Sequence, residues 1–566
     1  MTPKQDQRQE DSCVPRTRPQ DLSHHLGPRL LSYLLDIDVK SAEACDDELS
    51  NELEGSSRGL ALATLKKARD DVESVEYGDD ISISRAEIWT TWFMQRSGHE
   101  SVMATRLHEC SVGRKDERGA TDTVEGCLAQ IVQDLYAGLV IYSRTEDKAK
   151  AKTPWGYWCF QHPLKREFDR LVMQDSDLRH LFLGSNETPE FTGWNTRSTG
   201  LSGTYYLLLF AGNIIGSGLK IAQFSGDPLT VDGIVAGALM SVAMIRLSLQ
   251  GEDVSIPVRV GFSGILLPDG CNTIEMTGGI IRATREEDRY FWSGTPLDSS
   301  GGASMRTADG QITKISHHGD IVLELDVPYT ISLDRADDEQ WWLPGKMATL
   351  ARINEAFENL RLGLLLSKPS DRYTIVQSWT SIADPMDPWN GLSYANESAF
   401  FSLRPAQLGE VELGEWVRWA NLVDDHRTSS VSVSIRRMLM ASSERSNPED
   451  ILVDAVMVWE NLFGCDFDTT KKITGALAVL LSPEGGRSSE KFDRQKSYKR
   501  IYGLRSRVVH GVPGLDLMEV GDGAQEAVDV SISALREIFG EQHYLLAIDS
   551  SDKRGEKLRY KGETRN

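Results

Sequence analysis

Cysteine is scarce in this chain and follows no pairing pattern. The 566 residues include seven cysteines, scattered along the sequence with no Cys-x-x-Cys pair. Such spacing favours free thiols in a reducing compartment over a disulfide framework or a zinc site. The first 20 residues are polar and charged, so they lack the apolar core of a signal peptide. We therefore expect a cytoplasmic protein.

Positive charge is also in short supply. Asp and Glu number 84 against 62 Lys and Arg, which gives a net charge of -22. A chain of this charge does not attract DNA or anionic membranes by bulk electrostatics, so any contact with nucleic acid requires a local basic site. The uncharged run 201–219 contains four glycines and several polar residues. We interpret it as buried core and expect no membrane contact.

Length and hydrophobic patterning predict a multidomain α+β protein, because a chain this long exceeds one hydrophobic core. An N-terminal helical region, a central antiparallel β-rich domain and a C-terminal all-α bundle are expected. The predicted boundaries are a disordered tail at 1–20, a helical sensor or regulatory domain at 21–195, a mixed β-rich domain at 196–340, a helical domain at 341–545 and a basic disordered tail at 546–566.

Individual elements follow from periodicity. Residues 231–249 are typical of a buried helix, whereas the branched runs at 256–260 and 321–325 indicate strands separated by turn-forming residues. Helices are expected over 450–463 and 491–509 in the last part of the chain.

One segment of the last predicted helices combines an arginine with a histidine. Residues 502–511 are YGLRSRVVHG, which places Arg505 five positions before His510. An arginine carries a permanent positive charge and a planar fork of donors that suits a phosphate. A histidine gives or takes a proton near neutral pH. Such a pair can cleave RNA without a metal ion.

The surroundings of this pair are basic. Between Arg487 and His510 there are eight Lys or Arg and two acids, a local net charge of +6. On an acidic protein this stretch concentrates attraction for a polyanion such as RNA. The ordinary alternative is a solvated, lysine-rich helix face.

The segment 502–511 resembles the signature of the HEPN superfamily, especially the ApeA-like branch found in bacterial defence proteins. An earlier segment, 454–463 with the sequence DAVMVWENLF, resembles the glutamate-bearing helix of the same branch. The resemblance covers about the last third of the chain and implies that the C-terminal domain is a HEPN-like helical bundle.

The resemblance implies a metal-independent endoribonuclease that acts as a homodimer through this domain and needs no cofactor. His510 would be the acid or base, Arg505 the phosphate clamp, and Ser506 a residue that positions either of them. Cleavage would leave a 2′,3′-cyclic phosphate and a 5′-hydroxyl. The residues expected to contact the RNA substrate are Lys499, Arg500, Tyr502 and Arg507.

Helix geometry constrains the pair. Five residues of an α-helix turn through about 500°, which leaves Arg505 and His510 about 140° apart around the axis. Either the helix is distorted near Gly503, or two copies of the chain share one cleft across a twofold axis. We favour the dimer. Glu460 is either a partly buried carboxylate that orients Arg505 or Arg507, or an ordinary exposed glutamate.

The resemblance further suggests a toxin-like effector of anti-phage defence and abortive infection, restrained by the first 340 residues until a phage-derived or protein trigger acts on them. Two alternatives stay open at this stage. The HEPN-like bundle is catalytically inactive and serves for dimerisation or nucleotide binding, or the whole chain is a regulatory, antitoxin-type protein that binds DNA through its N-terminal helices.

Overall fold

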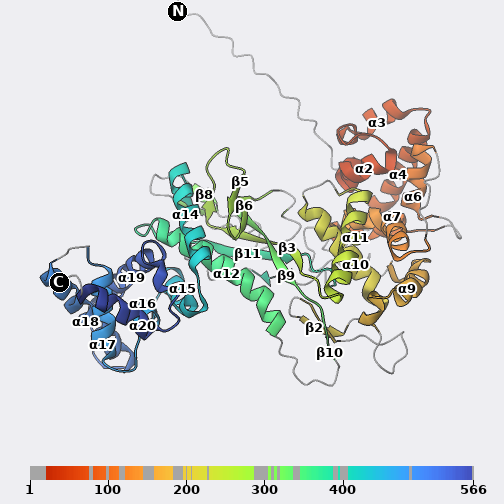
Figure 1. The fold of residues 1–566 in the computed structure, drawn as a ribbon. Helices are drawn as coiled ribbons and strands as arrows, with labels where there is room; N and C mark the ends of the chain where they lie inside the picture. Colours follow the sequence, from red (N-terminus) through yellow and green to blue (C-terminus); the bar gives the residue numbers. More distant parts are fainter. Residues whose placement is uncertain are drawn as a thin grey trace, which may run out of the picture. The chain divides into compact units, whose positions relative to one another are not determined.

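The structure, a computed structural model, describes residues 21–74, 81–96, 101–113, 121–143, 159–182, 195–198, 201–204, 207–225, 229–285, 288, 304–306, 312–314, 319–334, 344–386, 393–394, 406–483 and 487–563. The fold is mixed α+β with an antiparallel sheet in the middle of the chain, as expected (Figure 1). The expected disordered tail at 1–20 lies outside the described residues.

The chain divides into two compact units that do not follow the boundaries expected at 195 and 340. The first unit comprises Met1–Val254, Tyr329–Lys346 and Ala383–Asn390. The second comprises Ser255–Pro328, Met347–Ile382 and Gly391–Asn566. Each unit therefore draws on separate stretches of the sequence.

The described part of the first unit is mainly helical. A small antiparallel sheet, in the order β10-β1-β2, joins Ser332–Asp334, Asn195–Ser198 and Leu201–Thr204. The helices are α1 (Leu22–Leu26), α2 (Pro28–Leu35), α3 (Asp46–Leu53), α4 (Ser57–Glu73), α5 (Ile81–Phe93), α6 (Met103–Val112), α7 (Val124–Ser143), α9 (Lys165–Gln174), α10 (Leu207–Phe224) and α11 (Val231–Leu249).

Helices α10 and α11 pack against each other at glycines. A Cβ added at Gly218 would lie 2.4 Å from the backbone nitrogen of Ala238, so only glycine allows this approach. Helix α11 has the bounds predicted from the sequence, whereas the uncharged run 201–219 divides into strand β2 and most of helix α10. In the described part of the chain, α7, α10 and α11 are long and apolar enough to cross a membrane.

The second unit contains a six-stranded sheet in the order β12-β11-β3-β9-β6-β5. Its strands are β12 (Ser393–Tyr394), β11 (Val376–Ile382), β3 (Val254–Ser263), β9 (Ile321–Tyr329), β6 (Gly279–Ala283) and β5 (Thr273–Met276). Strand β11 pairs antiparallel with β3 and comes from the region expected to be wholly helical. Gly261 of β3 faces Trp379 of β11, and a Cβ there would lie 2.2 Å from the indole nitrogen.

The second unit also holds two two-stranded sheets, β13-β4 (Ala406–Gln407 and Ile265–Leu266) and β7-β8 (Ser304–Arg306 and Ile312–Lys314). The rest of its described part is mainly helical, and most of the helices gather into the bundle drawn in blue in Figure 1. Buried Trp459 lies in its core, where its indole N–H donates to Ser531 Oγ at 2.8 Å. The helices are α12 (Pro344–Ser367), α14 (Glu410–His426), α15 (Ser432–Leu439), α16 (Pro448–Phe463), α17 (Thr469–Leu480), α18 (Ser488–Val509), α19 (Leu517–Phe539) and α20 (Ser551–Glu563).

Helix α20 replaces most of the disordered tail expected at 546–566. Its Arg554 is 1% exposed and donates to the backbone carbonyls of Asn461 and Leu462 at 2.9 and 3.0 Å. These carbonyls belong to the last turn of α16, where helix geometry leaves no intrahelical partner. Arg554 thus ties the tail to α16, and Leu558 of the same helix is 3% exposed in the core of the bundle. Composition reveals neither contact.

Candidate functional site

Helices α16 and α18 carry the residues that the sequence singled out. On α18, the buried side chains of Tyr498, Ile501 and Leu504 form the stripe that faces the core. Tyr502 and Arg505, spaced three residues apart, lie at the edge of this stripe, where one helix meets its neighbour. On α16, the burial of Trp459 and its neighbours leaves Glu460 partly exposed at the same edge.

The Glu460 carboxylate joins both α18 side chains. Its Oε1 accepts a hydrogen bond from the Tyr502 hydroxyl at 2.6 Å, and its Oε2 accepts one from Arg505 Nη2 at 3.1 Å. The guanidinium carbon of Arg505 also lies 6.0 Å from the centre of the Tyr502 ring. Glu460 therefore holds Arg505 rather than Arg507.

This three-residue cluster is partly shielded from water. The side chains of Arg505 and Glu460 are 20% and 27% exposed. Burial, together with the hydrogen bond to Glu460, raises the pKa of the Tyr502 hydroxyl above its ordinary value. The Nε of Arg505 is buried and has no hydrogen-bond partner among the described residues. Because a guanidinium has five N–H donors, Arg505 retains donors for an anion beside Glu460.

His510 stands where α18 ends. Its backbone N–H donates to the Ser506 carbonyl, and Gly511 follows with a φ of +63°. The N–H of Gly511 donates to the Val508 carbonyl, and the N–H of Val512 donates to the Arg507 carbonyl. These two bonds form a Schellman motif. The His-Gly pair of the segment thus has a physical cause, since the glycine supplies the left-handed residue that ends the helix beside His510.

Helix α18 runs without interruption from Ser488 to Val509, through Gly503. The distortion considered as one way to bring Arg505 and His510 together is therefore absent from this described helix. The imidazole of His510 is exposed and has no hydrogen-bond partner among the described residues. The Ser506 hydroxyl makes no hydrogen bond to Arg505 or His510 among the described residues.

Two of the three basic residues expected to contact RNA have acidic partners that the sequence interpretation missed. Arg500 pairs with Glu526, and Arg507 Nη2 lies 2.7 Å from Glu519 Oε1, both on α19. Lys499 is exposed to solvent. With Glu460, these acids halve the local charge of +6. Pairing between helices gives no signal within the basic segment itself.

The described residues contain no group of three or more His, Cys, Asp or Glu placed to hold a metal ion. Nor do known proteins identify the site: no family model, curated protein or solved structure matches this chain. The functional argument therefore rests on the residues and their geometry.

Proposed function

We propose that the C-terminal bundle is a HEPN-type endoribonuclease that cuts RNA without a metal ion, using Arg505 and His510. The observation that carries this proposal is the bond between Glu460 and Arg505. It joins the two segments that resemble HEPN proteins, 454–463 and 502–511, although they are separate in sequence. If the two resemblances arose by chance, there would be no reason for Glu460 and Arg505 to form a hydrogen bond.

The proposed reaction is an internal transesterification. His510 takes the proton from the ribose 2′-hydroxyl or delivers one to the leaving oxygen. The 2′-oxygen forms a bond to the adjacent phosphorus, and the bond from phosphorus to the 5′-oxygen breaks. Arg505 stabilises the negative charge that develops on the phosphoryl oxygens. The products are a 2′,3′-cyclic phosphate and a 5′-hydroxyl, and no redox partner or cofactor is consumed.

A homodimer completes the proposed site. Because α18 is a regular helix, Arg505 and His510 of one copy diverge around its axis. The chain next to His510 exposes apolar side chains that a second copy would cover. These are Val509 (51% exposed), Val512 (42%), Leu517 (67%) and Met518 (73%).

The biological role follows from the resemblance alone. Uncontrolled RNA cleavage harms the cell that makes the enzyme, so the remainder of the chain, residues 1–340, is proposed to restrain the bundle. Phage infection is the proposed trigger, and abortive infection the proposed outcome. In this scheme the protein acts in the cytoplasm, without membrane attachment.

The test is cleavage of total and transfer RNA by the full chain in the presence of EDTA, with identification of the end groups. Arg505→Ala and His510→Ala should each abolish cleavage, because each removes one half of the chemistry. Arg418→Ala is the matched control, since Arg418 is an exposed cation on α14 of the same unit. Cleavage at the wild-type rate by both site variants would refute the assignment.

A protein that binds RNA or nucleotide without cutting it, even when phage-infected cell extract is added, would favour the inactive dimerisation module instead. Sequence-selective duplex DNA binding by the full chain would favour the antitoxin-type alternative. A dimer that persists in His510→Ala would separate loss of chemistry from loss of assembly.

A further inference from the structure

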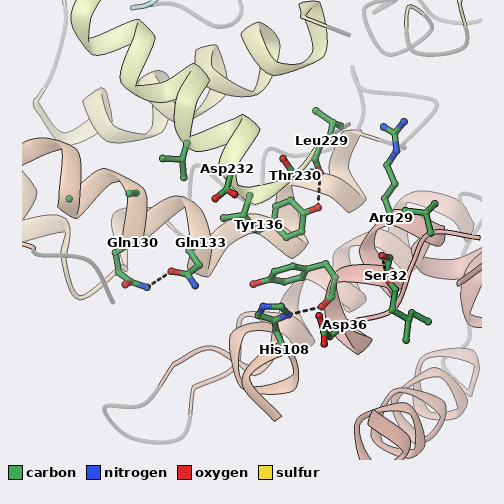
Figure 2. A pocket seen from close by; sticks show the side chains of 17 residues that line it. Arg29, Ser32, Asp36, His108, Gln130, Gln133, Tyr136, Leu229, Thr230 and Asp232 are labelled. Atoms are coloured by element: carbon green, nitrogen blue, oxygen red, sulfur yellow. Dashed lines mark hydrogen bonds between the residues drawn. The ribbon is translucent and has the colours of Figure 1, made fainter. Parts of the chain in front are cut away.

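The first unit contains a cavity of about 740 Å³ that the proposed nuclease does not use. Residues of α2, α6, α7 and the beginning of α11 line it, as Figure 2 shows. Pockets of this volume hold small organic ligands in other proteins. The chemistry of the lining indicates which class of ligand fits.

One wall of the cavity is aromatic and held in place by hydrogen bonds. The rings of Tyr33 and His108 stack with their centres 4.2 Å apart, and Tyr136 meets Tyr33 edge-on at 4.7 Å. His108 Nδ1 lies 2.7 Å from the Tyr33 carbonyl oxygen, and the buried Tyr136 hydroxyl donates to the Leu229 carbonyl at 2.6 Å. This wall is preformed and suits the apolar face of a planar ring.

A pair of amides lies elsewhere in the lining. Gln130 and Gln133 of α7 sit together in Figure 2, and Gln130 Nε2 donates to Gln133 Oε1 at 3.3 Å. Gln130 is only 4% exposed, and its Oε1 has no donor among the described residues. A buried acceptor without a donor is unfavourable. A ligand that presents an N–H group to Gln130 would satisfy it.

The lining holds one cation, Arg29, and two carboxylates, Asp36 and Asp232. Arg29 and Asp232 have opposite charges, and neither has an ion-pair partner among the described residues. The other carboxylate, that of Asp36, pairs with Arg58. A lining without excess positive charge favours a neutral ligand over a polyphosphate.

We propose that this cavity binds a nucleoside. The heterocycle lies against the aromatic wall, and its hydrogen-bonding edge meets the Gln130 and Gln133 amides, as amides recognise base edges elsewhere. The Asp232 carboxylate accepts hydrogen bonds from the ribose hydroxyls, a common role for an acidic residue. This proposal does not depend on the nuclease, because the cavity lies wholly within the first unit.

Isothermal titration calorimetry on the full chain tests the proposal with adenosine, guanosine, cytidine and uridine, with their 5′-triphosphates, and with tryptophan as a zwitterionic aromatic compound. At least one nucleoside should bind, and about tenfold more tightly than its triphosphate. Gln130→Leu and Asp232→Asn should each weaken that nucleoside about tenfold. Arg170 is an exposed cation on α9, and Arg170→Ala should bind the nucleoside as tightly as the wild type does.

Three results would overturn the proposal: no nucleoside binds at about 1 mM, tryptophan alone binds, or both cavity variants bind as the wild type does. Circular dichroism verifies that each variant is folded. Because Asp232 is exposed, Asp232→Asn keeps the test decisive even where Gln130→Leu disturbs the packing of α7.

Discussion

Glu460 and Arg505 are 45 positions apart in the chain, yet Oε2 of the first accepts a hydrogen bond from Nη2 of the second at 3.1 Å. The second carboxylate oxygen accepts from Tyr502 on the same helix as Arg505. One carboxylate therefore positions the arginine that is proposed to bind the scissile phosphate.

Glu460→Gln should loosen Arg505, because a glutamine has one acceptor oxygen for two donors. We expect the free energy of unfolding to fall by about 1 kcal/mol, as measured by urea denaturation. The kcat/KM for RNA cleavage should fall about tenfold as the guanidinium leaves its productive position. Glu519, the partner of Arg507, is more exposed than Glu460. Glu519→Gln should therefore lower the free energy of unfolding by less than about 0.5 kcal/mol. Equal effects in both variants would contradict a special role for Glu460.

Tyr502→Phe should change the response to alkaline pH. Burial and the bond to Glu460 raise the pKa of the Tyr502 hydroxyl in the folded state. The stability linked to this group is therefore fully present below the unfolded tyrosine pKa of about 10, and it is lost as pH rises beyond that value. Urea midpoints compared at about pH 8 and pH 11 should fall further for the wild type than for the variant. Parallel declines would show that Tyr502 ionises as it does in the unfolded chain.

Gly511→Ala should disturb the end of α18 without changing the side chain of Arg505 or His510. A residue with a side chain is strained at a φ of +63°. We therefore expect the free energy of unfolding to fall by about 1 kcal/mol and RNA cleavage to slow. Gly503→Ala is the control, because Gly503 lies within the same helix with open space around it. Alanine there should raise stability by about 0.5 to 1 kcal/mol. An unchanged cleavage rate in Gly511→Ala would show that the helix end does not position His510.

Arg554→Lys should destabilise α16 from a distance. A lysine ammonium group cannot reach all the carbonyls that the planar guanidinium contacts. We therefore expect the free energy of unfolding to fall by about 2 to 3 kcal/mol. Hydrogen–deuterium exchange should quicken in peptides that cover the last turn of α16. Lys553→Ala changes an exposed neighbouring cation and should leave that exchange unaltered. Equal exchange rates in both variants would contradict the interpretation of Arg554 as the cap of α16.

The sequence predicted the parts of the fold that depend on local patterning. Helix α11 has its predicted bounds, and α18 begins three residues before the predicted 491 and ends at the predicted 509. Strand β11 was missed because its buried faces include serine and threonine. Ser378 is 1% exposed and its Oγ lies 2.7 Å from Ser263 Oγ on β3. Polar residues satisfied by a neighbouring strand give no hydrophobic alternation.

The same limit applies to the site. The motif identified Arg505 and His510, and the helical pattern around Glu460 left two interpretations of that residue equally open. Contact between α16 and α18 decides that Glu460 bonds Arg505. The acids of α19 that pair with Arg500 and Arg507 were missed, because only packing brings them beside the basic helix. Likewise, the cavity proposed to bind a nucleoside combines residues of four helices that no short motif unites.

The cap supplied by Arg554 has a consequence for synthesis on the ribosome. This residue is 92 positions beyond Leu462, whose carbonyl it binds, so helix α16 emerges from the exit tunnel long before its final turn is satisfied. The carboxylate that anchors Arg505 reaches its mature surroundings only late in translation. Under the proposed function, this delay would postpone completion of an RNA-cutting site until the end of synthesis.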